Sequence, residues 1–137
     1  MADQNGKLSI VVFSGTTDKL MSVGVLSQAA AALGSEVKLF VTFWGLLSFT
    51  KAEKPNIFPK EFESMAPALA KSMKEHNTPS WYDMITEAKS MGAKVYACSL
   101  ASELMGIKKE DMDPIVDDVV GAATFLAEAE GGQMLFI

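Results

Sequence analysis

Short, unbroken apolar runs recur along this chain, and most are bordered by turn residues and by stretches with helical spacing. A strand inside a parallel sheet is buried on both faces, so it is typically continuous rather than alternating in pattern. Strands that alternate with helices connect by right-handed crossovers, which cover both faces of the sheet. We therefore predict one α/β domain over 1–137: a three-layer α/β/α sandwich with an open, mainly parallel, doubly wound sheet of about five strands. The clearest strands are 7–13, 37–43, 93–98 and 133–137.

Helices are predicted between these strands from apolar spacing and end signals. A helix over 18–33 begins near Asp18 and ends before Gly34, and its predicted apolar stripe consists of Leu20, Val23, Leu26, Ala30 and Leu33. Ser80 and Asp83 have capping spacing at the start of a helix over 80–91. Further helices are expected from about residue 44, over 100–105 and over 120–130. A fifth strand is placed at Ile115 and Val116, inside a polar connection over 108–118.

The stretch 51–79 departs from this alternation, and we interpret it as an insertion or lid. It is rich in charges and contains Pro55, Pro59 and Pro79, and an amphipathic helix is expected through Phe62, Met65, Leu69 and Met73. His76, the only histidine, lies in this stretch and is expected to be an exposed loop residue rather than a partner of the cysteine.

Composition narrows the function classes. The formal net charge is -5, and all twelve basic residues are Lys, so neither a nucleic-acid footprint nor the bidentate grip of Arg on an anion is expected. The N-terminal residues lack the pattern of a signal peptide, and no apolar run is long enough to span a membrane. A single cysteine allows no internal disulfide, which agrees with a reducing compartment. We expect a cytoplasmic protein.

The carboxyl ends of the predicted strands are where ligands bind in open parallel sheets. Cys98 is the only strong nucleophile there, and the helix that follows it would stabilise a thiolate, whereas apolar neighbours such as Phe43 or Trp44 would disfavour one. Cys98 as a small buried apolar residue is the alternative. The candidate site is Cys98 as the catalytic residue, with substrate contacts from Ser14, Gly15, Thr16, Phe43, Trp44, Gly45 and Ser99.

Other site types have weaker support. The turn 14–17 has the hydroxyls and glycine of an anion cradle, but an ordinary turn and N-cap explain it as well. The acidic residues in 110–118 do not match the spacing of a calcium loop and indicate a solvated connection. Hydrolase, zinc and dithiol motifs are missing from the sequence, so no metal and no cofactor is expected.

Three segments together resemble the DsrE/DsrF-like superfamily, in the branch labelled peroxiredoxin-like. They are 39–46 (LFVTFWGL), 97–107 (ACSLASELMGI) and 121–126 (GAATFL), in the same order as in the family. The resemblance covers nearly the whole chain except 51–79. It implies a doubly wound sheet, a homo-oligomer, and a cysteine, here Cys98, that carries sulfane sulfur as a persulfide or thiosulfonate. It also implies small sulfur-containing anions as ligands, and TusA-like carriers and rhodanese-type donors as partners.

Three functions follow, of which a sulfur carrier or sulfurtransferase acting through Cys98 is preferred. Ser99 and the N–H groups beyond it would hold the thiolate, while Ser14, Thr16 and Trp44 would shape the pocket. A thiol peroxidase is less favoured because the chain contains no Arg to polarise a peroxide. The third function is a non-catalytic oligomeric binding module in which Cys98 is buried. The single cysteine excludes a dithiol cycle within one subunit.

Overall fold

Five parallel strands form one sheet in the computed structural model, which describes residues 6–54 and 56–137. The spatial order is β4-β3-β2-β1-β5, and each neighbouring pair is parallel. This architecture confirms the predicted open α/β sheet. The strands are β1 (Lys7–Val12), β2 (Glu36–Val41), β3 (Lys94–Cys98), β4 (Asp118–Val120) and β5 (Gln133–Phe136).

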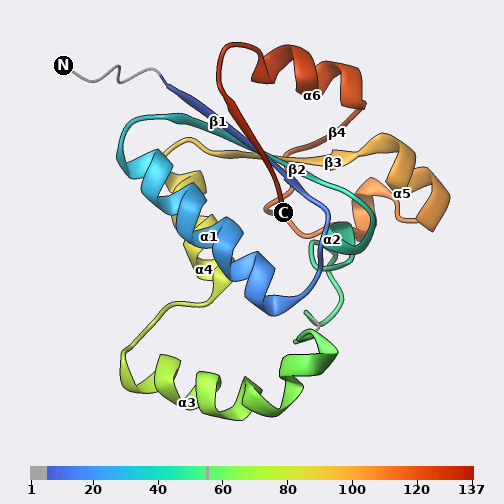
Figure 1. The fold of residues 1–137 in the computed structure, drawn as a ribbon. Coiled ribbons are helices and arrows are strands. Elements are labelled where there is room, and N and C mark those ends of the chain that lie inside the picture. Colours follow the sequence, from blue (N-terminus) through green and yellow to red (C-terminus); the bar gives the residue numbers. More distant parts are fainter. Residues whose placement is uncertain (1–5, 55) are drawn as a thin grey trace.

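Helices lie on both sides of this sheet, which gives the predicted three layers. Figure 1 shows α1 and α4 side by side on one face and α6 across the other. Gly24 lets α1 approach α4 closely, since a Cβ at this position would lie 3.0 Å from the Met84 Cβ. The α-helices are α1 (Thr17–Ala32), α2 (Phe43–Leu47), α3 (Ala66–Glu75), α4 (Trp81–Ser90), α5 (Ser99–Met105) and α6 (Ala122–Ala129). No helix within 6–54 or 56–137 is long and apolar enough to cross a membrane.

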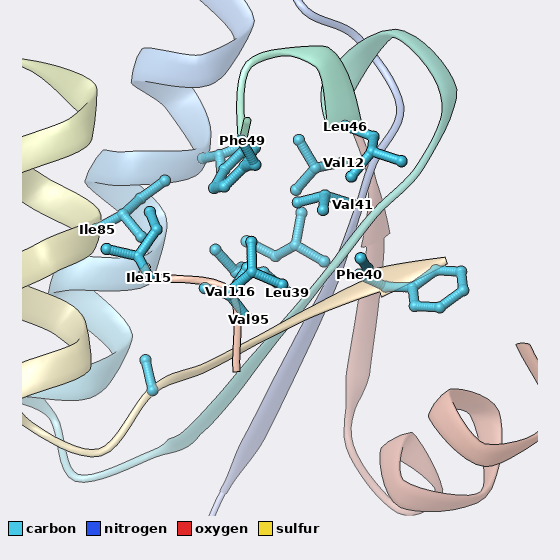
Figure 2. Packing of buried hydrophobic residues seen from close by; sticks show 14 of the residues in the cluster. Val12, Leu39, Phe40, Val41, Leu46, Phe49, Ile85, Val95, Ile115 and Val116 are labelled. Atoms are coloured by element: carbon cyan, nitrogen blue, oxygen red, sulfur yellow. The ribbon is translucent and has the colours of Figure 1, made fainter. Parts of the chain in front are cut away.

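The main core lies between the sheet and the layer of α1 and α4. Ile10, Leu39 and Val95 are fully buried and occupy matching register positions on β1, β2 and β3. Figure 2 shows Leu39 and Val95 in the same cluster as Ile85 of α4. Burial of each of these side chains contributes about 1.5–3 kcal/mol relative to leaving it exposed.

The buried stripe of α1 differs from the predicted one. Leu20 and Val23 are buried as expected, but Leu33 is 73% exposed and Leu26 is also exposed. The close contact of α1 with α4 turns the small residues Gly24 and Ser27 inward instead. Small side chains therefore form part of the helix contact, which a search for large apolar residues does not detect.

The opposite face of the sheet is covered by α6. Phe40 points away from the main cluster in Figure 2, and its ring stacks on Phe125 of α6 with centroids 4.7 Å apart. At the polar end of this contact, Glu128 accepts hydrogen bonds from Lys38 at 2.6 Å and from the Tyr96 hydroxyl at 3.1 Å. Lys38 is the main cause of the lowered pKa of Glu128. One aromatic stack and one ion pair thus fix α6 to the sheet.

The predicted fifth strand was misplaced, because β4 is Asp118–Val120 and Ile115 and Val116 precede it. Val116 N–H donates to the Asp113 carbonyl in a turn, so this apolar pair is buried without joining the sheet. Asp117 begins the pairing instead: its N–H donates to the Val95 carbonyl, and its carboxylate accepts the N–H of Val95.

The prediction of a solvated acidic connection was wrong at Asp113, which is 6% exposed. Its carboxylate accepts hydrogen bonds from Lys54 Nζ at 2.7 Å, from the Tyr82 hydroxyl at 2.8 Å and from the Ile115 N–H at 3.0 Å. Burial raises the pKa of Asp113, but these three donors outweigh it and hold the pKa below its usual value. Burial and the Asp113 carboxylate raise the pKa of Tyr82 to about 12.

Within 51–79, the predicted amphipathic helix is present as a 3-10 turn, η1 (Lys60–Met65), followed by α3. Figure 1 shows both away from the sheet, beyond the N-terminal end of α1. Neither element buries a residue, and Phe62 and Met65 are more than half exposed. Thr17 joins α1 to this stretch, because its hydroxyl donates to Asn56 and its N–H to the Ile57 carbonyl. The role of the stretch 51–79 as a lid stays a prediction.

Candidate functional site

Three of the predicted site segments lie at one edge of the sheet. They follow β1, β2 and β3, which are parallel neighbours, so their carboxyl ends meet at the same edge. Figure 1 shows α2 and α5 starting at this edge. The first two segments also interlock through their backbones: Gly45 N–H donates to the Phe13 carbonyl at 2.8 Å.

The structure brings Ser14, Gly15, Thr16 and Trp44 together around one pocket of about 300 Å³. Most of the exposed wall is apolar. The hydroxyls of Ser14 and Thr16 are 3.1 Å apart and hydrogen-bond to each other, and Ser14 Oγ also accepts the N–H of Thr16. Three lining residues were not foreseen from the sequence: Leu47, Ser48 and Ile57.

Cys98 occupies the N-cap position of α5. Its Sγ accepts the N–H of Ala101 at 3.5 Å, and its carbonyl accepts the Ser102 hydroxyl at 2.9 Å. The sequence did not predict this cap, because Cys is not among the preferred N-cap residues, which are Ser, Thr, Asp, Asn and Gly. The side chain is largely enclosed, because Cys98 is only 8% exposed.

Ser99, which follows the thiol, is exposed and lies beside the start of α6. A Cβ at Gly121 would lie 3.8 Å from Ser99 Oγ, so the N-terminal ends of α5 and α6 approach each other here. Leu100, the next residue, is 58% exposed. A molecule that approaches the thiol from this side would therefore meet both a hydroxyl and an apolar side chain.

Phe43 and Gly45 have positions different from those expected. Phe43 begins α2 rather than ending a strand, and its φ of 45° is unusual for a bulky residue. Its ring packs between Phe13 and Trp44, with centroid distances of 5.8 and 6.1 Å. Gly45 is buried against β1. Neither residue belongs to the lining of the pocket around Ser14.

The predicted substrate residues and the thiol thus share an edge but are not all brought into one cavity. Cys98 and Ser99 are not among the described residues that line the 300 Å³ pocket. His76 is exposed at the end of α3, where its Nδ1 lies 2.8 Å from the Ser72 carbonyl oxygen. Within 6–54 and 56–137, no group of three or more His, Cys, Asp or Glu side chains is arranged to hold a metal ion.

The fold and the site together describe a small α/β domain with five parallel strands and a cysteine at the carboxyl end of β3. The model of the DsrE/DsrF/DrsH-like family matches residues 4–69 and 59–137. The chain belongs to this family. The finer placement in the peroxiredoxin-like branch stays a prediction.

Two relatives resemble the chain along nearly its whole length. The uncharacterized protein YrkE of Bacillus subtilis is 33% identical over 162 aligned positions, covering 100% of each chain. The sulfur carrier protein DsrE2 of Allochromatium vinosum is 26% identical, covering 96% of this chain and 98% of that protein.

Two solved structures share the fold at low sequence identity. MTH1491 from Methanobacterium thermoautotrophicum, a protein of unknown function, superimposes with a TM-score of 0.66 at 12% identity, covering 97% of this chain and 100% of the other. The ychN protein from E. coli gives a TM-score of 0.63 at 11% identity, with 96% and 97% covered. These likenesses establish the fold alone.

Proposed function

We propose that this protein is a cytoplasmic sulfur carrier that holds sulfane sulfur on Cys98 and relays it to another protein. The observation that carries the proposal is the position of Cys98, at the carboxyl end of β3 and the N-cap of α5, in a family that includes a sulfur carrier. Membership in a sulfur-relay family agrees with this role.

The contacts of Cys98 hold its sulfur in place at the start of α5. The N–H of Ala101 donates to Sγ, so a backbone donor lies against the sulfur that would carry the added atom. Ser102 Oγ holds the Cys98 carbonyl and so fixes the turn from strand to helix. Ser99, the exposed first residue of α5, would supply a hydroxyl to a terminal sulfur or a sulfonate group on Cys98.

The transfer is redox-neutral. The Cys98 thiolate attacks the outer sulfur of a donor persulfide, a Cys98–sulfur bond forms, the donor's S–S bond breaks, and the donor thiolate leaves with the electron pair. Attack by an acceptor thiolate on the outer sulfur of the Cys98 persulfide repeats the exchange and regenerates Cys98. Rhodanese-type proteins as donors and TusA-like carriers as acceptors fit this chemistry, and a single cysteine suffices for it.

Intact-mass measurement tests this proposal. Native protein is incubated with polysulfide, and we expect one added sulfur that dithiothreitol removes, with no addition to Cys98→Ser. A persulfidated protein should then lose its sulfur to a TusA-like acceptor. An equal adduct on Cys98→Ser, or no reducible adduct on the native chain, contradicts the proposal.

A second candidate function is favoured by the enclosure of Cys98, which is 8% exposed. In this alternative the chain is a non-catalytic module that assembles into a homo-oligomer. Exposed apolar side chains on α5 and α6 supply the contact surface: Leu100, Leu104 and Leu126.

Reaction with a thiol reagent separates the two functions. If the protein is a sulfur carrier, a maleimide should label Cys98 in the folded protein. If it is a non-catalytic module, we expect labelling only after denaturation. Light scattering on the same sample gives the oligomeric state. Rapid native labelling argues against the non-catalytic module.

A further inference from the structure

The pocket at the carboxyl end of β1 contains a polar group for which the protein offers no partner. Ser48 is 0% exposed, lines the pocket, and its Oγ has no hydrogen-bond partner within residues 6–54 and 56–137. An unpaired buried hydroxyl costs about 1–3 kcal/mol. A ligand that displaces the lining enough to reach Ser48 Oγ from the pocket would recover this cost.

The place in the fold supports a ligand. The pocket lies at the end of β1, where the strand order of the sheet reverses between β2 and β5, and ligands of open parallel sheets bind at such points. Figure 1 shows the turn after β1 entering α1 beside α2. Thr16 is the N-cap of α1, yet its side chain makes no capping hydrogen bond and faces Ser14 instead. A volume of about 300 Å³ suits a ligand of one ring.

The residues that line the pocket favour a neutral ligand. None of the described lining residues is charged, and Asp18 places a carboxylate in the first turn of α1, which opposes an anion at this helix end. The serine and threonine hydroxyls of the pocket can each donate and accept a hydrogen bond. They therefore match a ligand head group that also donates and accepts hydrogen bonds, such as a primary amide. Leu47, Ile57 and the indole of Trp44 offer apolar walls for a flat body.

We propose that this pocket is a binding site for a small planar ligand with a neutral, amide-like head, held by Ser48. It is separate from the sulfur chemistry of Cys98 and does not depend on it. The ligand's head donates to or accepts from Ser48 Oγ, while its ring lies against Trp44, Leu47 and Ile57.

Three probes with one ring and different heads test the site: benzamide, benzoate and toluene. The chain has two tryptophans, so the indole N–H resonances of Trp44 and Trp81 report separately, with Trp44→Phe giving the assignment. We expect benzamide to shift the Trp44 resonance and to bind more tightly than benzoate or toluene. Tighter binding of benzoate overturns the neutral class, and equal binding of toluene overturns the role of the head group.

A matched pair of variants tests the role of Ser48. Ser27 is also 0% exposed with an unpaired Oγ in the described part of the chain, but it does not line this pocket. We expect Ser48→Ala to weaken benzamide binding about tenfold, the value of one hydrogen bond of about 1.4 kcal/mol, and Ser27→Ala to leave it unchanged. Both variants should fold, because each removes an unpaired polar atom. Wild-type affinity in Ser48→Ala, or no shift of Trp44 with benzamide, overturns the proposal.

Discussion

Gly45 packs so closely against Val12 that a Cβ at position 45 would lie 2.3 Å from the Val12 carbonyl oxygen. Gly15 makes the reciprocal approach, since its Cβ would lie 2.6 Å from the Trp44 carbonyl oxygen. The turns after β1 and β2 therefore interlock through two glycines whose closest neighbours are backbone atoms. This contact fixes the wall of the pocket around Ser14.

Gly45→Ala should therefore destabilise the fold strongly, because backbone rather than a flexible side chain blocks the added methyl group. We expect the free energy of unfolding to fall by about 3 kcal/mol or more. Gly121→Ala is the control, since its Cβ would make only an ordinary contact, 3.8 Å from Ser99 Oγ. Urea denaturation measures both, and equal midpoints would show that the interlock can relax.

The sheet was predictable from the sequence because its central strands are continuous apolar runs. Ile10, Leu39 and Val95 belong to continuous apolar runs, and burial on both faces requires such runs. The strand β4 escaped prediction because it has only three residues and begins with Asp118. The apolar pair Ile115 and Val116 gave the stronger signal, although it is buried in a turn.

The sequence predicted at which edge of the sheet the site lies, but not all of the residues that line it. Strand ends indicated where Ser14, Trp44 and Cys98 would lie, because parallel strands bring their carboxyl ends together. Sequence could not show that Ser48 completes the pocket, since Ser48 follows a helix of five residues whose orientation depends on the glycine interlock. The buried role of Asp113 was equally hidden, because its partner Lys54 is 59 residues away.

Truncation of Phe125 should detach α6, because this ring is 1% exposed and stacks on Phe40. We expect Phe125→Ala to lower the free energy of unfolding by about 3–5 kcal/mol. The neighbouring Leu126 is 54% exposed, so Leu126→Ala should cost little in a monomer. Thermal unfolding of both variants checks the difference, and a large loss in Leu126→Ala alone would place the important contact outside the subunit.

Asp113→Asn should destabilise the protein at neutral pH and have less effect in acid. The pKa of Asp113 is lowered in the folded state, so its carboxylate contributes stability above the unfolded pKa, near 3.8, and that contribution is lost as the pH falls through the folded pKa. We expect a loss of about 2 kcal/mol at pH 7 that shrinks below about pH 4. Urea unfolding at several pH values measures it, with the exposed Glu103→Gln as control. A loss independent of pH would contradict the ionic role.

Tyr82→Phe should show the opposite dependence on pH. The pKa of Tyr82 is raised to about 12 by burial and by its hydrogen bond to Asp113, so the neutral phenol contributes stability that is fully present below the unfolded pKa, about 10. This contribution is lost as the pH rises toward 12 and beyond. We expect wild type to be more stable than Tyr82→Phe by about 1 kcal/mol at pH 8, with the difference decreasing above pH 10. Paired urea titrations isolate this group, because the other titrating side chains are common to both proteins. A difference that grows with pH would show that the phenolate, and not the phenol, is the form favoured beside Asp113.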